Sequence, residues 1–113
     1  MRTHYFQLAP KPFGLILSGK KVIESRLFDD KRKLIQIGDV IVFTNREDSG
    51  ATIRVVVEDF LHYTSFQEMF SSNNPILFGG DSAGSLEQEI RKFYSQKDED
   101  QYGVLGIRFE VVT

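Results

Sequence analysis

The chain has 113 residues, a length typical of one domain, and it contains no cysteine, which excludes disulfides and thiolate metal sites. His4 and His62 stand far apart without the spacing of zinc ligands, so we expect neither a metal nor another cofactor. The formal net charge of −2 argues against bulk nonspecific DNA binding, although it does not show how the charges are distributed.

The first residues lack the apolar run of a signal peptide, and no segment approaches the roughly 20 apolar residues that span a bilayer. We therefore expect a cytoplasmic protein without a membrane partner.

The first quarter of the chain predicts a strand, a short helix and a second strand. Apolar and polar residues alternate in Thr3–Leu8, which predicts the first strand. Ala9–Pro12 is a stiff connector, because proline cannot continue the hydrogen bonding of a strand. The apolar residues of Pro12–Ser18 recur at helical spacing, and Gly19 suits the left-handed position just past a helix end. Val22–Leu27 predicts the second strand.

The middle of the chain predicts two more strands with polar connections. Asp29–Lys33 is too charged for a core and indicates a loop, and Gly38-Asp39 is a turn signal. Val40–Phe43 is a short apolar strand, and Asn45–Gly50 is a polar hairpin loop. Thr52–Leu61, dense in branched residues, is the longest predicted strand.

The last part predicts two helices and a final strand. Thr64-Ser65 begins the first helix, because Ser65 stands three residues before Glu68 as in a capping box. Ser71–Gly84 is a long loop, and a second helix runs from about Ser85 to Ser95. Lys97–Gln101 is a charged linker, and Tyr102–Val112 is the last strand.

The predicted order is strand, helix, three strands, two helices, strand. Three strands joined by short loops predict an antiparallel meander, and strands this apolar need cover on both faces or closure into a barrel. We expect a small barrel in which the first and last strands pair with each other.

The densest group of charges surrounds the turn from the first helix to the second strand. Between Lys20 and Lys33 six basic residues face three acidic ones, a local charge of +3 on a chain that is acidic elsewhere. The basic residues are Lys20, Lys21, Arg26, Lys31, Arg32 and Lys33, and the acidic ones are Glu24, Asp29 and Asp30. Such a group is either a solvated loop or a rim that contacts phosphates.

Strand alternation places Glu24 and Arg26 on one face, about 7 Å apart at roughly 3.3 Å per residue. They form either a plain surface ion pair or a unit in which Glu24 orients the planar fork of Arg26 toward a phosphate or base edge. The same alternation places Lys21 on the other face, toward the interior. A buried lysine that loses its proton favours an enzyme, whereas a lysine paired with Glu24 keeps its charge and favours a binding module.

The residues Gly19-x-Lys21-x-x-Glu24-x-Arg26 resemble the signature of the ASCH family. Further motifs of this resemblance follow the same order along the chain: Pro10-x-Pro12-Phe13, Gly38-Asp39-x-Ile41-x-Phe43, Tyr63-x-x-Phe66 and Tyr102-Gly103-Val104-x-Gly106-Ile107. The ASCH family is similar in fold to PUA domains. The resemblance implies one α+β domain over residues 1–113, a small PUA-like mixed β-barrel with a short helix after the first strand and two helices before the last.

The resemblance also implies a cleft beside the first helix that binds RNA or a nucleotide-like ligand. The expected contacts are Lys20, Lys21, Glu24, Arg26, Lys31, Arg32, Lys33 and Tyr63. An alternative is a small amidohydrolase that removes an acyl group from a nucleoside such as acetylcytidine, with Lys21, Glu24 and Glu89 as catalytic residues. In that branch of the family a threonine stands where this chain has Glu24. A ribonuclease is a third possibility, and we expect a monomer or weak dimer.

Overall fold

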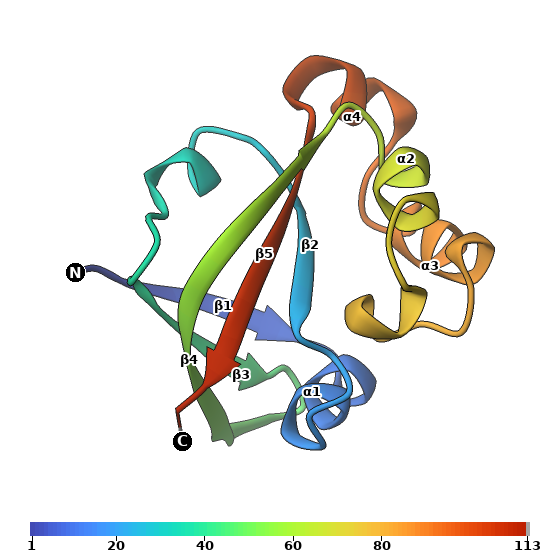
Figure 1. Ribbon diagram of the computed structural model, residues 1–113. Helices are drawn as coiled ribbons and strands as arrows, with labels where there is room; N and C mark the ends of the chain where they lie inside the picture. The colour runs from blue at the N-terminus through green and yellow to red at the C-terminus, as the bar shows by residue number, and fades with distance from the viewer. Residues whose placement is uncertain (113) are drawn as a thin grey trace.

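A five-stranded mixed sheet curls into a half-barrel in the computed structural model, which describes residues 1–112 (Figure 1). The strands are β1 (Thr3–Leu8), β2 (Ile23–Leu27), β3 (Val40–Asn45), β4 (Asp48–Tyr63) and β5 (Val104–Val111). The helices are α1 (Pro10–Leu17), α2 (Phe66–Ser71), α3 (Ala83–Ile90) and α4 (Gln96–Tyr102), with short 3₁₀ turns η1 (Arg32–Leu34) and η2 (Pro75–Phe78). No helix among residues 1–112 is long and apolar enough to cross a membrane.

The order of strands in the sheet is β1-β3-β4-β5-β2, so the first and last strands of the chain do not pair. β1 pairs with β3 in parallel, and the other neighbours are antiparallel. The expected closure through the terminal strands is therefore wrong, and β1 and β2 are the two open edges. The expected meander is correct only for β3 and β4, because β2 pairs with β5 instead. We call the gap between the edges β1 and β2 the seam.

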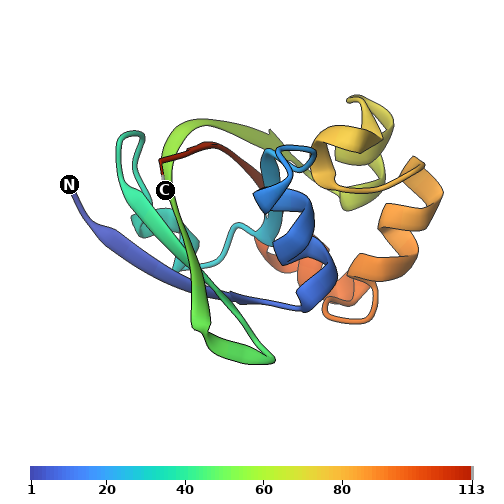
Figure 2. The ribbon, with the colours of Figure 1, turned by 90° about the horizontal axis from the view of Figure 1, so that it is seen from below.

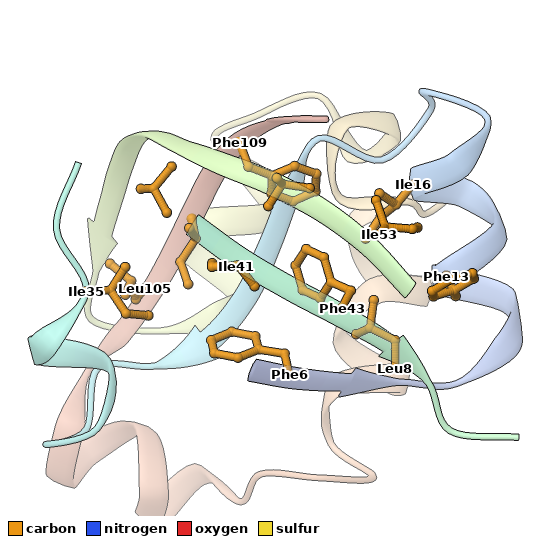
Figure 3. Close-up of a cluster of buried hydrophobic side chains, with 13 residues drawn as sticks. Phe6, Leu8, Phe13, Ile16, Ile35, Ile41, Phe43, Ile53, Leu105 and Phe109 are labelled. Carbon is orange, nitrogen blue, oxygen red and sulfur yellow. The ribbon is translucent and has the colours of Figure 1, made fainter. Parts of the chain in front are cut away.

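Helix α1 closes one end of the half-barrel because it links β1 to β2 and turns apolar side chains inward. Figure 2 shows α1 between the curved sheet and the group of helices α2 and α3. Phe13 and Ile16 of α1 join the main core, which also takes side chains from β1, β3, β4 and β5 (Figure 3). A second core lies under the helical layer, where Ile23 and Leu27 of β2 pack beside Phe66 and Phe70. β2 is therefore covered on both faces.

Several predicted boundaries shift in the structure. Helix α1 already begins at Pro10, since a proline in the first turn lacks only an N–H that would have no helical partner. The predicted loop at 45–50 shrinks to a tight turn, because β4 starts at Asp48 and runs for 16 residues. The long polar loop predicted at 71–84 contains η2, which Asn74 caps by accepting a hydrogen bond from the N–H of Ile76.

The segment before β5 contains more helix than the two helices that were predicted before the last strand. α3 begins after Ser82, which forms a capping box with Ser85, and it ends at Ile90. The predicted charged linker is helix α4, capped by Ser95. Its Glu99 is only 1 % exposed and accepts a hydrogen bond of 2.7 Å from the first N–H of α2. Three α-helices and η2 thus separate β4 from β5.

Candidate functional site

The turn after α1 places Lys21 at the entrance to β2. Gly19 adopts φ +81°, and the N–H groups of Lys20 and Lys21 both donate to the carbonyl of Leu15 at 3.0 Å. The aliphatic part of Lys21 packs against Gly79 at the end of η2. A Cβ at Gly79 would lie 3.1 Å from Cδ of Lys21. The turn at Gly19 and the contact with Gly79 therefore leave the side chain of Lys21 little conformational freedom.

Lys21, Glu24 and Arg26 form one buried network. Nζ of Lys21 donates to Oε1 of Glu24 at 2.7 Å, and Nε of Arg26 donates to Oε2 at 2.9 Å. The side chains are 9 %, 5 % and 17 % exposed. Burial alone would raise the pKa of Glu24, but the charges of Lys21 and Arg26 outweigh it and lower this pKa from 4.5 to about 2. One carboxylate thus holds two cations, and the network keeps one positive charge in excess.

The position of Lys21 differs from the one that strand alternation predicts. Glu24 and Arg26 pair with Ile107 and Leu105, which belong to the main core, so they point to the inner face of the half-barrel. Lys21 joins them on that face because it precedes β2 and is not bound by the alternation of the strand. Its Nζ lies 2.7 Å from Oε1 of Glu24, so Lys21 is engaged in a buried ion pair.

Arg26 bridges the seam. Its Nη2 donates to the carbonyl of Gln7 on β1 at 3.5 Å, and its guanidinium lies over the ring of Phe6 at 4.6 Å. Burial acts to lower the pKa of Arg26, and the Glu24 carboxylate and the Tyr94 hydroxyl raise it above its ordinary value. Tyr94 was not among the predicted site residues, because it is distant from Arg26 along the chain.

Arg32 reaches the same seam from η1, in the segment predicted to be a loop. Asp29 accepts from the backbone N–H of Arg32 at 3.1 Å and from its Nη1 at 2.9 Å. The guanidinium of Arg32 lies 5.5 Å from the centre of the Phe6 ring. Two arginines from different elements, Arg26 of β2 and Arg32 of η1, therefore lie near the Phe6 ring.

The other predicted site residues do not join this network. Glu89 is 68 % exposed and pairs with Lys92. The phenol oxygen of Tyr63 accepts a hydrogen bond from Asn73 at 3.3 Å, and its ring packs on the second core. Lys20 and Lys31 are exposed, and Lys33 lies over the ring of Phe28. Among residues 1–112 no three histidine, aspartate or glutamate side chains gather as metal ligands do.

Two shallow depressions border this region. One, of about 330 Å³, has Lys21 in its wall, but Glu58 and Glu110 also line it. Arg108 lines the same depression and lies 3.8 Å from Glu58, so two cations and two carboxylates balance there. The other depression, of about 310 Å³, is lined by Lys33, Asp39 and N-terminal residues and contains no member of the Lys21 network.

Comparisons with known proteins give one matching family and several similar solved structures. The ASCH domain family matches residues 6–113. The crystal structure of hypothetical protein PH0355 is 33 % identical with a TM-score of 0.86, covering 97 % of this chain and 99 % of that one. The solution structure of protein PF0455 from Pyrococcus furiosus is 34 % identical with a TM-score of 0.77, covering 97 % of each chain.

More distant structures share the fold alone. The crystal structure of ASCH from Zymomonas mobilis is 15 % identical with a TM-score of 0.68, covering 96 % of this chain and 67 % of that one. No curated protein matches the chain.

Proposed function

This chain belongs to the ASCH domain family, and we propose that it binds RNA or a nucleotide-like ligand along the seam between β1 and β2. The observation that supports this most directly is the network of Lys21, Glu24 and Arg26, in which one ionised carboxylate holds two cations. The excess positive charge lies at an open edge of the sheet and attracts an anion.

Each member of the network has a separate role in this proposal. Arg26 offers a phosphate or a base edge the guanidinium N–H groups that Glu24 and Gln7 leave free. Glu24 fixes the orientation of the guanidinium before the ligand arrives, so less conformational entropy is lost on binding. Lys21 acts as a point charge. Lys20, Lys31 and Lys33 are exposed and extend the attraction to neighbouring phosphates.

The test is fluorescence anisotropy with a labelled single-stranded RNA at several salt concentrations. Lys21→Ala and Arg26→Lys should each weaken binding about tenfold, as expected for the loss of a charge-assisted hydrogen bond. Lys97→Ala, which removes an exposed lysine of α4, is the matched control and should change affinity less than twofold. An RNA affinity that changes neither in the two site variants nor with salt concentration would refute the proposal.

Hydrolysis of an acylated nucleoside is the alternative that the family suggests. It requires Lys21 to act as a base or nucleophile, whereas Glu24 holds Lys21 in an ion pair and Glu89 pairs with Lys92. Incubation with acetylcytidine decides between the two. Release of cytidine that disappears in Lys21→Ala would replace the binding proposal with an amidohydrolase. Gel analysis of the RNA probe after incubation tests for ribonuclease activity in the same way.

We further propose that the domain acts in the cytoplasm as a monomer or weak dimer. Size-exclusion chromatography at increasing protein concentration tests the second part.

A further inference from the structure

Positive charge continues along the seam beyond the Lys21 network. The guanidinium of Arg26 lies 4.6 Å and that of Arg32 lies 5.5 Å from the centre of the Phe6 ring. The two guanidiniums are therefore at most about 10 Å apart. Phosphates follow one another every roughly 3.4 Å along the axis of a stacked strand, and further apart when the strand is extended. This upper bound is short enough for the two arginines to contact neighbouring phosphates of one strand.

Arg32 has hydrogen-bonding capacity that the protein leaves unused. Its Nη1 donates to Asp29, but its buried Nε has no hydrogen-bond partner. A buried donor without a partner costs free energy, and such groups in native structures call for an explanation. A small rotation of the guanidinium toward an incoming phosphate would give this N–H an acceptor.

The charge balance along the seam agrees with an anionic guest. Lys21, Arg26 and Arg32 carry three positive charges, and Glu24 and Asp29 carry two negative ones. Each carboxylate is already engaged by these cations, so neither faces the guest as a free negative charge. The balance is positive within a chain whose net charge is −2.

We propose that the seam binds two successive phosphates of single-stranded RNA, one at Lys21 and Arg26 and the next at Arg32. This rests on the proposed function and deepens it, because it makes the ligand an oligonucleotide rather than a free nucleoside. The side chains are largely buried, with Arg26 17 % and Arg32 14 % exposed. A flexible single strand can bring individual phosphates to side chains that are so little exposed, whereas a duplex presents its phosphates on a wide cylinder.

The experiment compares three probes by isothermal titration: uridine, uridine monophosphate, and the 5′-phosphorylated dinucleotide pUpU. The dinucleotide should bind at least about tenfold more tightly than the monophosphate, and uridine should bind most weakly. Arg32→Gln should abolish the gain from monophosphate to dinucleotide and leave monophosphate affinity within about twofold. Arg54→Gln, which removes an exposed arginine of β4, should retain the whole gain.

A second variant should strengthen binding, and impaired folding would not have this effect. Asp29→Asn removes the carboxylate partner of Arg32 and should tighten pUpU binding without changing monophosphate binding. In the salt dependence of binding to a longer single-stranded RNA, Arg32→Gln should lower the slope by about 0.7.

The outcomes separate this inference from the proposed function. Equal affinities for monophosphate and dinucleotide, or an Arg32→Gln variant that weakens both alike, would overturn the two-phosphate inference and leave the proposed function intact. A failure of every phosphate-bearing probe and of longer RNA to bind would overturn both.

Discussion

Glu24→Gln tests the central claim that one carboxylate holds the site together. Glutamine has the shape of glutamate without its charge, so the variant leaves Lys21 and Arg26 side by side with no counter-charge. Both cations are largely buried, at 9 % and 17 % exposure, and solvent screens them little. Removing one partner of a buried ion pair typically destabilises a protein by about 3–5 kcal/mol.

The pKa of Glu24 gives a second measure of the same effect. It is lowered from 4.5 to about 2 because Lys21 and Arg26 outweigh the opposing effect of burial. At about 1.36 kcal/mol per unit, this depression corresponds to about 3 kcal/mol. Because the folded pKa is depressed, the stabilisation is fully present above pH 4.5 and is lost as the pH falls toward 2. Roughly half should remain at pH 3.

Urea unfolding followed by circular dichroism measures both quantities. At pH 7, Glu24→Gln should lower the free energy of unfolding by about 3 kcal/mol, and the difference from the wild type should fall by roughly half at pH 3. A domain of this size is stable by about 5–15 kcal/mol, so the variant remains foldable. Glu89→Gln is the matched control and should change stability by less than about 1 kcal/mol, because its ion pair is exposed. A loss below about 1 kcal/mol in Glu24→Gln, or a difference independent of pH, would refute the reasoning.

Three further variants test neighbouring parts of the structure. Asp39→Asn should cost about 1–3 kcal/mol at pH 7, because Asp39 accepts hydrogen bonds from two backbone N–H groups. The pKa of Asp39 is lowered to about 2, so its contribution should vanish as the pH falls from about 4 to 2, and a pH-independent loss in urea unfolding would contradict this. Gly79→Ala should cost about 1–2 kcal/mol, since φ is +85°, and should also weaken RNA binding by displacing Lys21; unchanged anisotropy would contradict the second part. Glu99→Gln should cost about 3 kcal/mol or more, because a carboxylate that is 0 % exposed would no longer pair with Arg91; a thermal midpoint within about 2 °C of wild type would argue against this.

Features that depend on residues close together in the chain were predicted correctly from the sequence. All five strands were predicted close to where they lie, because alternation and branched residues act locally. The cap at Ser65 is confirmed by its hydrogen bond from the N–H of Glu68. The charges around the turn after α1 were identified as a group, and the ion pairs of Glu24 with Lys21 and Arg26 bring part of that group together.

The predictions from the sequence were wrong where a contact joins segments that are distant along the chain. The wrong pairing of the terminal strands came from assuming that strands at the two ends of a chain close a barrel. Glu99 was assigned to a charged linker, yet its carboxylate is buried and binds the N–H of Phe66 at the start of α2. Arg32 was grouped with Lys31 and Lys33 by sequence, although only Arg32 turns toward Phe6.

The sequence by itself determined which segments form strands and short helices, the family of the domain, and the residue types that gather near its first turn. These depend on spacing within a few residues, where backbone geometry is nearly constant. Only the tertiary structure decided that β1 and β2 remain open edges, that Lys21 and Glu24 share a face, and that two arginines meet at Phe6. Such contacts join elements whose relative placement depends on packing of the whole core, which no local pattern encodes.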